Sequence, residues 1–300
     1  MTETTTGWPA IDSPETLATK LAERDYLPGD GLVQAAYLAL TMGRPLFLEG
    51  DPGVGKTDFA RRIADAFSAR FIRLQCHAGL DVTQALYDWN FPRQMLALRA
   101  AGDEHSDRSR LLPGLYTEEF LHRRPILQAL GDRPAVLLID EIDRADDEFE
   151  ALLLEVLEDY RVDIPEFGQV KADVRPLVVL TSNRTREVHD ALKRRCLYHW
   201  ITHPDPELEA RILRRRVPKL AEALSHEIAA GMARVRASPA VTKPPGIAES
   251  IDFGHALAAR GAGTLDPTAV EATLSTLVKH HDDRDVINRL LLVPGPRKAS

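Results

Sequence analysis

The sequence predicts an α/β fold, in which a parallel sheet covered by helices precedes a smaller, all-helical region. Short apolar runs alternate with segments of helical periodicity through the first two thirds of the chain. Several of these runs are apolar at every position, which is typical of strands buried on both faces of a parallel sheet. Beyond HPDPE at 203–207 only helical patterns follow. We therefore predict an α/β core over 1–203 and a helical domain over 204–300.

The first predicted elements are helices within residues 14–42. Pro14 follows Ser13, which fits a first helical position after an N-cap, and a second helical run ends near Gly43. RPLFLEG at 44–50 is then a short apolar strand that ends in glycine. From Thr57 onward the pattern is helical again, with apolar residues on one face.

Further strands follow along the core. FIRLQC at 71–76 and AVLLID at 135–140 are apolar runs of strand length. Residues 158–183 read as a strand, a turn, a second strand and another buried strand. A short basic helix then covers DALKRRC at 190–196.

Composition limits the possible functions. The 300 residues carry a formal net charge of −7, with 44% hydrophobic and 28% charged residues, as in soluble globular proteins. An acidic chain is a poor DNA-tracking protein, because phosphate backbones select basic surfaces. No apolar run approaches the ~18 residues that cross a bilayer, and the N-terminus lacks a signal-peptide pattern. The two cysteines, Cys76 and Cys196, are far apart, so we expect no disulfide framework and a cytoplasmic location.

The stretch LEGDPGVGKT at 48–57 has the spacing G-x-x-x-x-G-K-[ST]. Its glycines let backbone N–H groups surround a β-phosphate, Lys56 reaches the β- and γ-phosphate oxygens, and the Thr57 hydroxyl holds Mg²⁺. A glycine turn without function is the alternative, but the strand before and the helix after are what phosphate binding requires. The predicted nucleotide-binding residues are Gly50, Asp51, Pro52, Gly53, Val54, Gly55, Lys56, Thr57 and Asp58.

A second motif, VLLIDEID at 136–143, places Asp140 and Glu141 at the carboxyl end of an apolar strand. Ligands bind at this edge of an open parallel sheet. Asp140 can order the Mg²⁺ shell together with Thr57, and Glu141 can polarise the attacking water as a general base. Acidic residues also follow strands on a solvated rim, but the upstream phosphate loop favours the functional interpretation.

Two later features fit the same chemistry. VVLTSN at 178–183 ends in Asn183, whose amide can bond the γ-phosphate or the attacking water, although it can also simply turn the chain. Arg194 and Arg195 lie where a short helix would end. A guanidinium neutralises charge on a transferring phosphoryl group, but basic residues at a helix C-terminus are also expected from the helix dipole.

In this order, the motifs resemble those of AAA+ ATPases over essentially the whole chain. Within the superfamily, LEGDPGVGKT, residues 136–168 and PLVVLTSNRTREVHDALKRRC at 176–196 are most similar to the MoxR family. The last two stretches, with KPPGIAES at 243–250, resemble the MoxR-type ATPases encoded with molybdenum-containing carbon monoxide dehydrogenases, which mature the metal centre.

The resemblance implies a P-loop AAA+ core followed by a helical lid, with Asp140 and Glu141 as the Walker B pair and Asn183 as sensor 1. It implies an arginine finger at Arg195 or Arg194, of which Arg195 matches the arginine of the DRF-like triplet in relatives. It further implies a β-hairpin over 158–175 and a helical insertion within 77–125.

One feature departs from the family pattern. PPGIAESIDFGHAL, at the start of the third lid helix, contains no arginine where many relatives have sensor 2. Arg211 or the run 214–216 can supply that charge from another helix, or the lid couples weakly to the γ-phosphate. We assign no sensor 2 residue.

The resemblance implies an ATPase that uses ATP and Mg²⁺, works as a homo-oligomeric ring such as a hexamer, and serves as a chaperone. Its implied partners are a client metalloenzyme, with a molybdenum hydroxylase as one candidate, and an adaptor with a von Willebrand A domain. Two alternatives stay open: a DNA-directed AAA+ motor or loader, which the acidic composition disfavours, and a P-loop kinase acting on a small metabolite. No nucleic-acid partner and no membrane span are expected.

Overall fold

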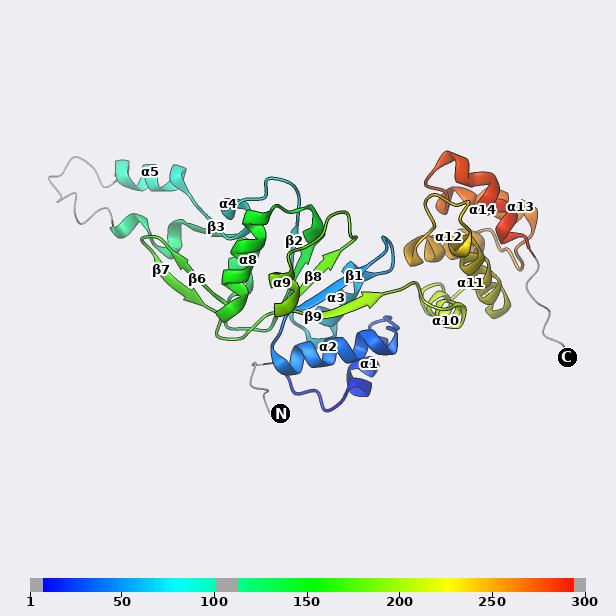
Figure 1. Cartoon of the computed structure of the whole chain (residues 1–300), viewed down its shortest axis with the longest axis horizontal. Coiled ribbons are helices and arrows are strands. Elements are labelled where there is room, and N and C mark those ends of the chain that lie inside the picture. Colours follow the sequence, from blue (N-terminus) through cyan, green and yellow to red (C-terminus); the bar gives the residue numbers. More distant parts are fainter. Residues whose placement is uncertain (1–7, 101–112, 294–300) are drawn as a thin grey trace. The chain divides into compact units, whose positions relative to one another are not determined.

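The computed structural model describes residues 8–100 and 113–293 (Figure 1). The chain divides into two compact units, which we treat separately. The first comprises the residues up to Leu17, Gly31–Glu49 and Ala60–His199. The second comprises Ala18–Asp30, Gly50–Phe59 and the residues from Trp200 onward. The phosphate loop thus belongs to the same unit as the C-terminal helices, and the domain boundary predicted at 203/204 stays a prediction.

The central sheet has five strands in the order β2-β5-β8-β1-β9. The pairs β2–β5, β5–β8 and β8–β1 are parallel, which confirms the predicted parallel sheet. The strands are β1 (Leu46–Gly50), β2 (Arg70–Gln75), β5 (Ala135–Asp140), β8 (Leu177–Ser182) and β9 (Leu197–Ile201). β9 was not predicted, because this edge strand is only partly buried and LYHWI lacks a continuous apolar run.

The three inner strands β1, β5 and β8 are buried at every residue. This explains their unbroken apolar sequences, since helices cover both faces of a parallel sheet. On one face a core cluster joins Phe47, Ile139 and Leu180 to Ile126 and Leu153 of two covering helices. The helices around the sheet are α1 (Pro14–Ala22), α2 (Asp30–Met42), α3 (Lys56–Phe67), α7 (Pro125–Ala129), α8 (Asp147–Asp159) and α9 (Asp190–Arg195).

The helical stretch expected over 14–42 consists of α1 and α2, since Pro28 and Gly29 lie in the break between them. The turn after β5 is the 3-10 helix η3 (Ile142–Arg144), and α8 follows it. α8 begins where Asp146 caps the backbone N–H of Phe149 at 3.0 Å.

Among the described residues, the first unit also contains two antiparallel strand pairs, of which one is a hairpin. The predicted hairpin before β8 is confirmed as β6 (Arg161–Ile164) and β7 (Gly168–Lys171). The other, β3 (Tyr87–Trp89) with β4 (Leu121–Arg123), was not predicted. The Trp89 ring lies 6.4 Å from the ring of Phe167 in the β6–β7 turn, measured between centroids, so the two strand pairs contact each other there. The helical insertion expected within 77–125 is formed by α4 (Val82–Ala85), α5 (Phe91–Ala100), η1 (Pro113–Leu115) and η2 (Glu118–Phe120), and its part at 101–112 lies outside the described residues.

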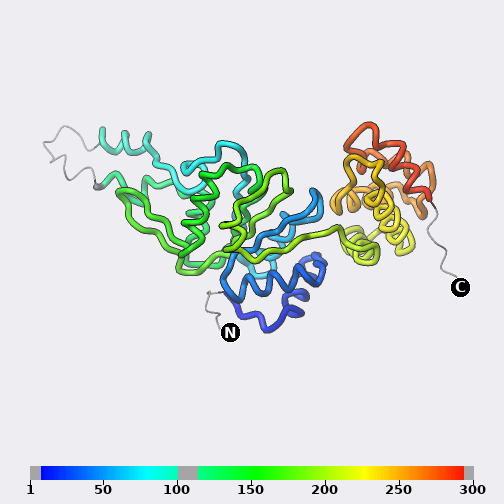
Figure 2. Tube along the Cα trace, viewed as in Figure 1, coloured from blue at the N-terminus to red at the C-terminus, as the bar shows by residue number. Residues whose placement is uncertain are grey.

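The second unit is helical after β9, and the coils of its helices can be followed in Figure 2. No strand occurs among its described residues beyond 203, as predicted. Its helices are α10 (Pro206–Arg216), α11 (Glu222–Ala237), α12 (Ile247–Ala259), α13 (Pro267–Thr273), η4 (Leu274–Thr276), η5 (His281–Asp283) and α14 (Arg284–Leu291). A buried ion pair joins α10 to α11, because Arg236 Nη1 lies 2.6 Å from Glu209 Oε2. Arg236 also donates to Ser250 Oγ at 3.0 Å, which adds α12.

None of the helices that the model describes is both long and apolar enough to traverse a bilayer.

Candidate nucleotide-binding and hydrolysis site

The predicted phosphate loop follows directly from β1, and α3 begins at Lys56. β1 ends at Gly50, where a Cβ would lie 2.3 Å from the carbonyl oxygen of Ile201, so only glycine fits there. Gly53 has φ +82°, in the left-handed region that favours glycine. The sequence spacing therefore produces a tight loop whose backbone conformation most other residues would not adopt.

Lys56 lies folded into this loop. Its Nζ donates to the carbonyl oxygens of Gly50 at 2.6 Å and Asp51 at 2.8 Å, and the residue is 7% exposed. Two carbonyl dipoles thus stabilise a largely buried ammonium. The remaining predicted loop residues are placed around it: Val54 is buried, Asp51 and Pro52 are exposed, and Gly55, Thr57 and Asp58 are half-buried.

The start of α12 packs directly on the loop. The Ile247 N–H donates to Gly53 O at 3.0 Å, and a Cβ on Gly246 would lie 2.6 Å from Gly53 Cα. Glu249 caps this helix end by accepting the Gly246 N–H at 3.0 Å. The helix start that lacks a sensor 2 arginine therefore contacts the phosphate loop through its own backbone, at Gly246 and Ile247.

The arginines of α10 considered as substitutes for sensor 2 mostly have other partners. Arg214 pairs with Glu222 at 2.7 Å and Arg215 with Asp25 at 2.6 Å. Arg216 lies 3.4 Å from Asp58 in the first turn of α3, which makes it the member of 214–216 that contacts the predicted site. Of the arginines 214–216, Arg216 is therefore the one that forms an ion pair with the first turn of α3.

His203, just after β9, was not singled out from the sequence. Burial, together with the positive charge of Arg236, lowers the pKa of His203 to about 4, and the charges of Asp51 and Lys56 also act on it. The imidazole is therefore neutral at pH 7. It lies in the electrostatic surroundings of the phosphate loop without adding to its positive charge.

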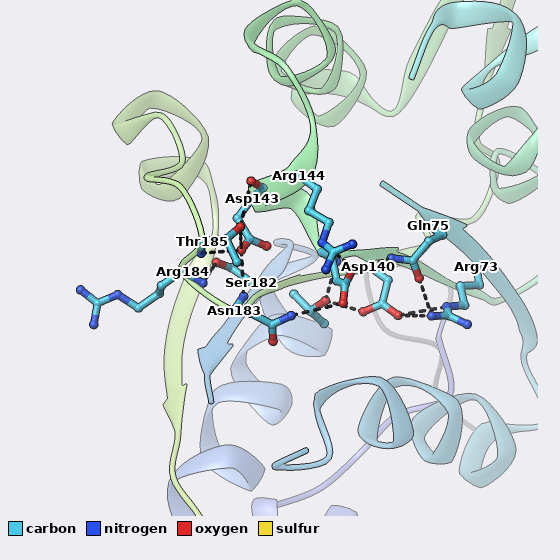
Figure 3. A network of polar contacts seen from close by, with 11 residues as sticks. Arg73, Gln75, Asp140, Asp143, Arg144, Ser182, Asn183, Arg184 and Thr185 are labelled. Atoms are coloured by element: carbon cyan, nitrogen blue, oxygen red, sulfur yellow. Dashed lines mark hydrogen bonds and ion pairs between the residues drawn. The ribbon is translucent and has the colours of Figure 1, made fainter. Parts of the chain in front are cut away.

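Asp140 ends β5, as predicted (Figure 3), and Glu141 follows it. Thr181 of β8 contacts both residues. The Thr181 hydroxyl donates to Asp140 Oδ1 at 2.5 Å and accepts the Glu141 N–H at 2.9 Å. Asp140 is 3% exposed. One hydroxyl therefore fixes both the buried carboxylate and the backbone of its neighbour.

Glu141 has a left-handed backbone, with φ 57° and ψ 52°. Such a conformation costs a residue other than glycine on the order of 1–3 kcal/mol, and it persists only where surrounding contacts enforce it. Here it turns the chain sharply from β5 into η3. The strained residue is the one predicted to act as the general base.

The Glu141 carboxylate contacts three polar side chains among the residues that the structure describes. Its Oε2 accepts from Gln75 Nε2 at 2.9 Å and lies 3.0 Å from Arg144 Nε, while its Oε1 accepts from Asn183 Nδ2 at 3.3 Å. The predicted sensor residue Asn183 is thus brought to the predicted base. Gln75 and Arg144 were not identified from the sequence.

Arg73 is a further residue that sequence reasoning missed. Its Nε and Nη2 donate to Asp140 Oδ2 at 3.0 and 2.6 Å, and Nη2 also donates to Gln75 Oε1 at 2.5 Å (Figure 3). Arg73 and Gln75 are exposed on either side of the buried Leu74. Two polar residues at the period of a strand, close to its carboxyl end, were the signal that could have identified them.

The loop after β8 is anchored by two buried carboxylates. Asp143 Oδ2 accepts the N–H and the hydroxyl of Thr185, at 2.8 and 2.7 Å, and the Asn183 N–H at 3.3 Å. Glu150 accepts the His189 N–H at 2.8 Å and pairs with Arg186. These bonds hold the loop that carries Asn183 against η3 and α8.

The two candidate finger residues end α9 and differ in their surroundings. The Arg195 guanidinium donates to Leu154 O of α8 and lies 3.5 Å from Glu158. The Arg194 side chain is exposed and has no hydrogen bond or ion pair among the described residues. Arg44 donates to the backbone carbonyls of both, at 2.8 and 3.2 Å, and so caps the helix that carries them.

Both cysteines are free and buried. Burial, with the negative charge of Asp140, raises the pKa of Cys76 to about 12, and burial does the same for Cys196. Both therefore remain protonated thiols near neutral pH, which makes them unreactive as nucleophiles.

The residues predicted to hold Mg²⁺ have suitable chemistry. Thr57 offers a hydroxyl and Asp140 a buried carboxylate, both hard oxygen donors. No group of three or more His, Cys, Asp or Glu side chains suited to a metal occurs within the described ranges. Mg²⁺ usually takes one or two protein ligands and completes its shell with waters and phosphates, so each of these two residues, taken by itself, is a donor of the kind that Mg²⁺ accepts.

Solved structures of RuvB from Thermotoga maritima are among those similar to this chain. The RuvB Holliday junction branch migration motor is 18% identical with a TM-score of 0.44, over 88% of this chain and 68% of that one. A point mutant of that RuvB is 18% identical with a TM-score of 0.47, over 88% of this chain and 69% of that one. No curated protein matches.

A protein-family model also matches, and it spans residues 45–196, from β1 to the end of α9. That range contains the phosphate loop, Asp140, Glu141, Asn183 and both candidate finger arginines. The match covers more than half of the chain. The chain therefore belongs to the AAA domain family, in its dynein-related subfamily.

Proposed function

We propose that this chain is an ATP-hydrolysing chaperone of MoxR type, which forms a homo-oligomeric ring and remodels or matures a metalloenzyme. Its family membership supports the nucleotide chemistry. The observation that carries the catalytic assignment is the carboxylate of Glu141, which lies in hydrogen-bond contact with Asn183, next to the buried Asp140. The similarity of residues 136–168 and 176–196 to MoxR sequences supports a metalloenzyme as the client and a von Willebrand A domain protein as the adaptor.

In the proposed reaction Lys56 exchanges its two carbonyl contacts for β- and γ-phosphate oxygens, and backbone N–H groups of the loop surround the β-phosphate. Thr57 and Asp140 would hold Mg²⁺, which when bound neutralises charge on the transferring phosphoryl group. These residues bind and orient the nucleotide. None of them removes a proton.

Proton removal falls to Glu141. Its carboxylate accepts a proton from the attacking water, and Asn183, which donates to one carboxylate oxygen, positions the base or the water. Thr181 fixes the Glu141 backbone, so the base does not need to reorganise during the reaction. Binding and hydrolysis therefore depend on different side chains.

Substitutions of Lys56 and Glu141 should separate nucleotide binding from hydrolysis. Lys56→Ala should abolish ATP binding, because the charge that meets the phosphates is lost. Glu141→Gln should bind ATP normally but hydrolyse it about 10²–10⁴-fold more slowly, since an amide cannot accept the proton. Calorimetric titration with ATP and a phosphate-release assay measure the two effects.

The exposed Glu148 provides a matched control, because Glu148→Gln removes the same charge on α8 and should change neither quantity. Equal losses of ATP affinity in the Lys56 and Glu141 variants would contradict the assigned roles.

A second prediction concerns the arginine finger. We assign it to Arg195, on which the family motif falls, and infer that in a ring its guanidinium exchanges Leu154 and Glu158 for the phosphates of a neighbouring subunit. Arg195→Ala should lower turnover about 10³-fold with little change in ATP affinity. Mixing Arg195→Ala with Lys56→Ala subunits should restore part of the ATPase activity, because some interfaces then combine an intact lysine with an intact arginine.

Arg194→Ala, which removes the adjacent exposed guanidinium, is the control and should remain nearly fully active. The opposite pattern would move the finger to Arg194. Absence of recovery in rings confirmed to be mixed would count against a finger acting between subunits.

The chaperone role predicts a trapped complex. Glu141→Gln protein loaded with ATP should form rings by light scattering and retain a metalloenzyme and a von Willebrand A domain protein in an affinity capture, whereas Lys56→Ala should retain neither. A strictly monomeric Glu141→Gln protein would favour a small-molecule kinase. ATPase activity stimulated by DNA, without a captured metalloenzyme, would favour a DNA-directed motor.

A further inference from the structure

Arg73 forms an ion pair with the carboxylate predicted to order the metal. Two of its guanidinium nitrogens contact Asp140 Oδ2, at 2.6 and 3.0 Å. The Asp140 side chain is 5% exposed, whereas that of Arg73 is 46% exposed. The cation therefore reaches a buried anion from the solvent side and can leave it without being buried itself.

The charge of this pair matters for any divalent ion next to Asp140. A carboxylate attracts Mg²⁺ through its full negative charge, and a guanidinium at hydrogen-bond distance offsets that charge while repelling a second cation. Asp140 is mostly shielded from water, so solvent screens this competition less than it would at an exposed pair.

We propose that Arg73 is an internal counter-ion of Asp140 that weakens divalent-cation binding and thereby sets how readily the nucleotide site takes up Mg²⁺. The inference rests on the proposed nucleotide-hydrolysing function. Arg73 is a positioning residue in this account, because it acts through Asp140.

The Arg73 guanidinium also links Asp140, through Gln75, to the predicted general base Glu141. Arg73 Nη2 donates to Gln75 Oε1, which leaves the amide nitrogen of Gln75 to donate to Glu141 Oε2 at 2.9 Å. When Arg73 releases Asp140, Gln75 loses the partner that fixes its amide orientation. Release of the counter-ion therefore also loosens one of the three contacts on the Glu141 carboxylate.

The test measures metal affinity without hydrolysis. Binding of a non-hydrolysable ATP analogue is titrated once with EDTA and once with saturating Mn²⁺, and the ratio of the two dissociation constants gives the factor by which the protein strengthens metal binding to the nucleotide. In Arg73→Ala this factor should rise about tenfold, because a repelling charge is gone. In Arg73→Lys, which keeps the charge, it should remain near the value of the unchanged protein.

Arg70→Ala is the matched control. Arg70 lies on the same strand, but its guanidinium donates to Gln128 O at 2.8 Å, so its removal should leave the factor unchanged. A purely structural role of Arg73 predicts the opposite sign, since a misplaced Asp140 would bind the metal more weakly.

An unchanged or lower factor in Arg73→Ala would overturn this inference and leave the proposed function intact. Failure of the unchanged protein to bind the nucleotide analogue at all would overturn both.

Discussion

Parallel pairing of β5 with β8 and of β8 with β1 is the constraint on which the candidate site depends. Parallel strands end at one edge, so Asp140, Ser182 and Gly50 finish their strands on the same side of the sheet. The register aligns Glu49 with Ser182, and it aligns Gln75 of β2 with Asp140. Strand pairing alone therefore brings together residues that are distant in sequence.

The edge concentrates negative charge, and the structure offsets it locally. Asp140 is paired with Arg73, Glu141 with Arg144, and the buried Glu49 lies 3.6 Å from Arg184. Unpaired buried carboxylates would be costly, so these arginines stabilise the edge. The pairs of Asp140 and Glu141 also restrain groups that the proposed nucleotide chemistry would use. The left-handed backbone of Glu141 fits the same view, since Thr181 holds it in a conformation that is unfavourable in isolation.

Much of this arrangement could be predicted from local sequence. The G-x-x-x-x-G-K-T spacing located the phosphate loop, and apolar runs ending in DE and SN located the strand ends. The alternating polar positions at the end of β2 could have marked Arg73 and Gln75 as candidates. Their partners, like those of Thr181, depend on the alignment of β2, β5 and β8, which no single segment encodes. The strands β3, β4 and β9 were not predicted for a different reason. They are short and partly exposed, so their sequences show neither a continuous apolar run nor a clear alternation of apolar and polar residues. The packing of Gly246 against Gly53 joins segments almost two hundred residues apart, and nothing in PPGIAES alone indicates it.

The proposed function requires that the loop after β1 and the segments that follow β5 and β8 respond to the same nucleotide, as the order of their motifs in the sequence predicts. Amide hydrogen–deuterium exchange, measured with and without Mg²⁺ and the non-hydrolysable ATP analogue, follows all of these segments at once. Nucleotide binding should slow exchange in 51–57, 141–144 and 181–185, with little change in β3 and β4. Protection confined to one of these segments, or centred on the β3–β4 strand pair, would show that the segments do not bind a common nucleotide.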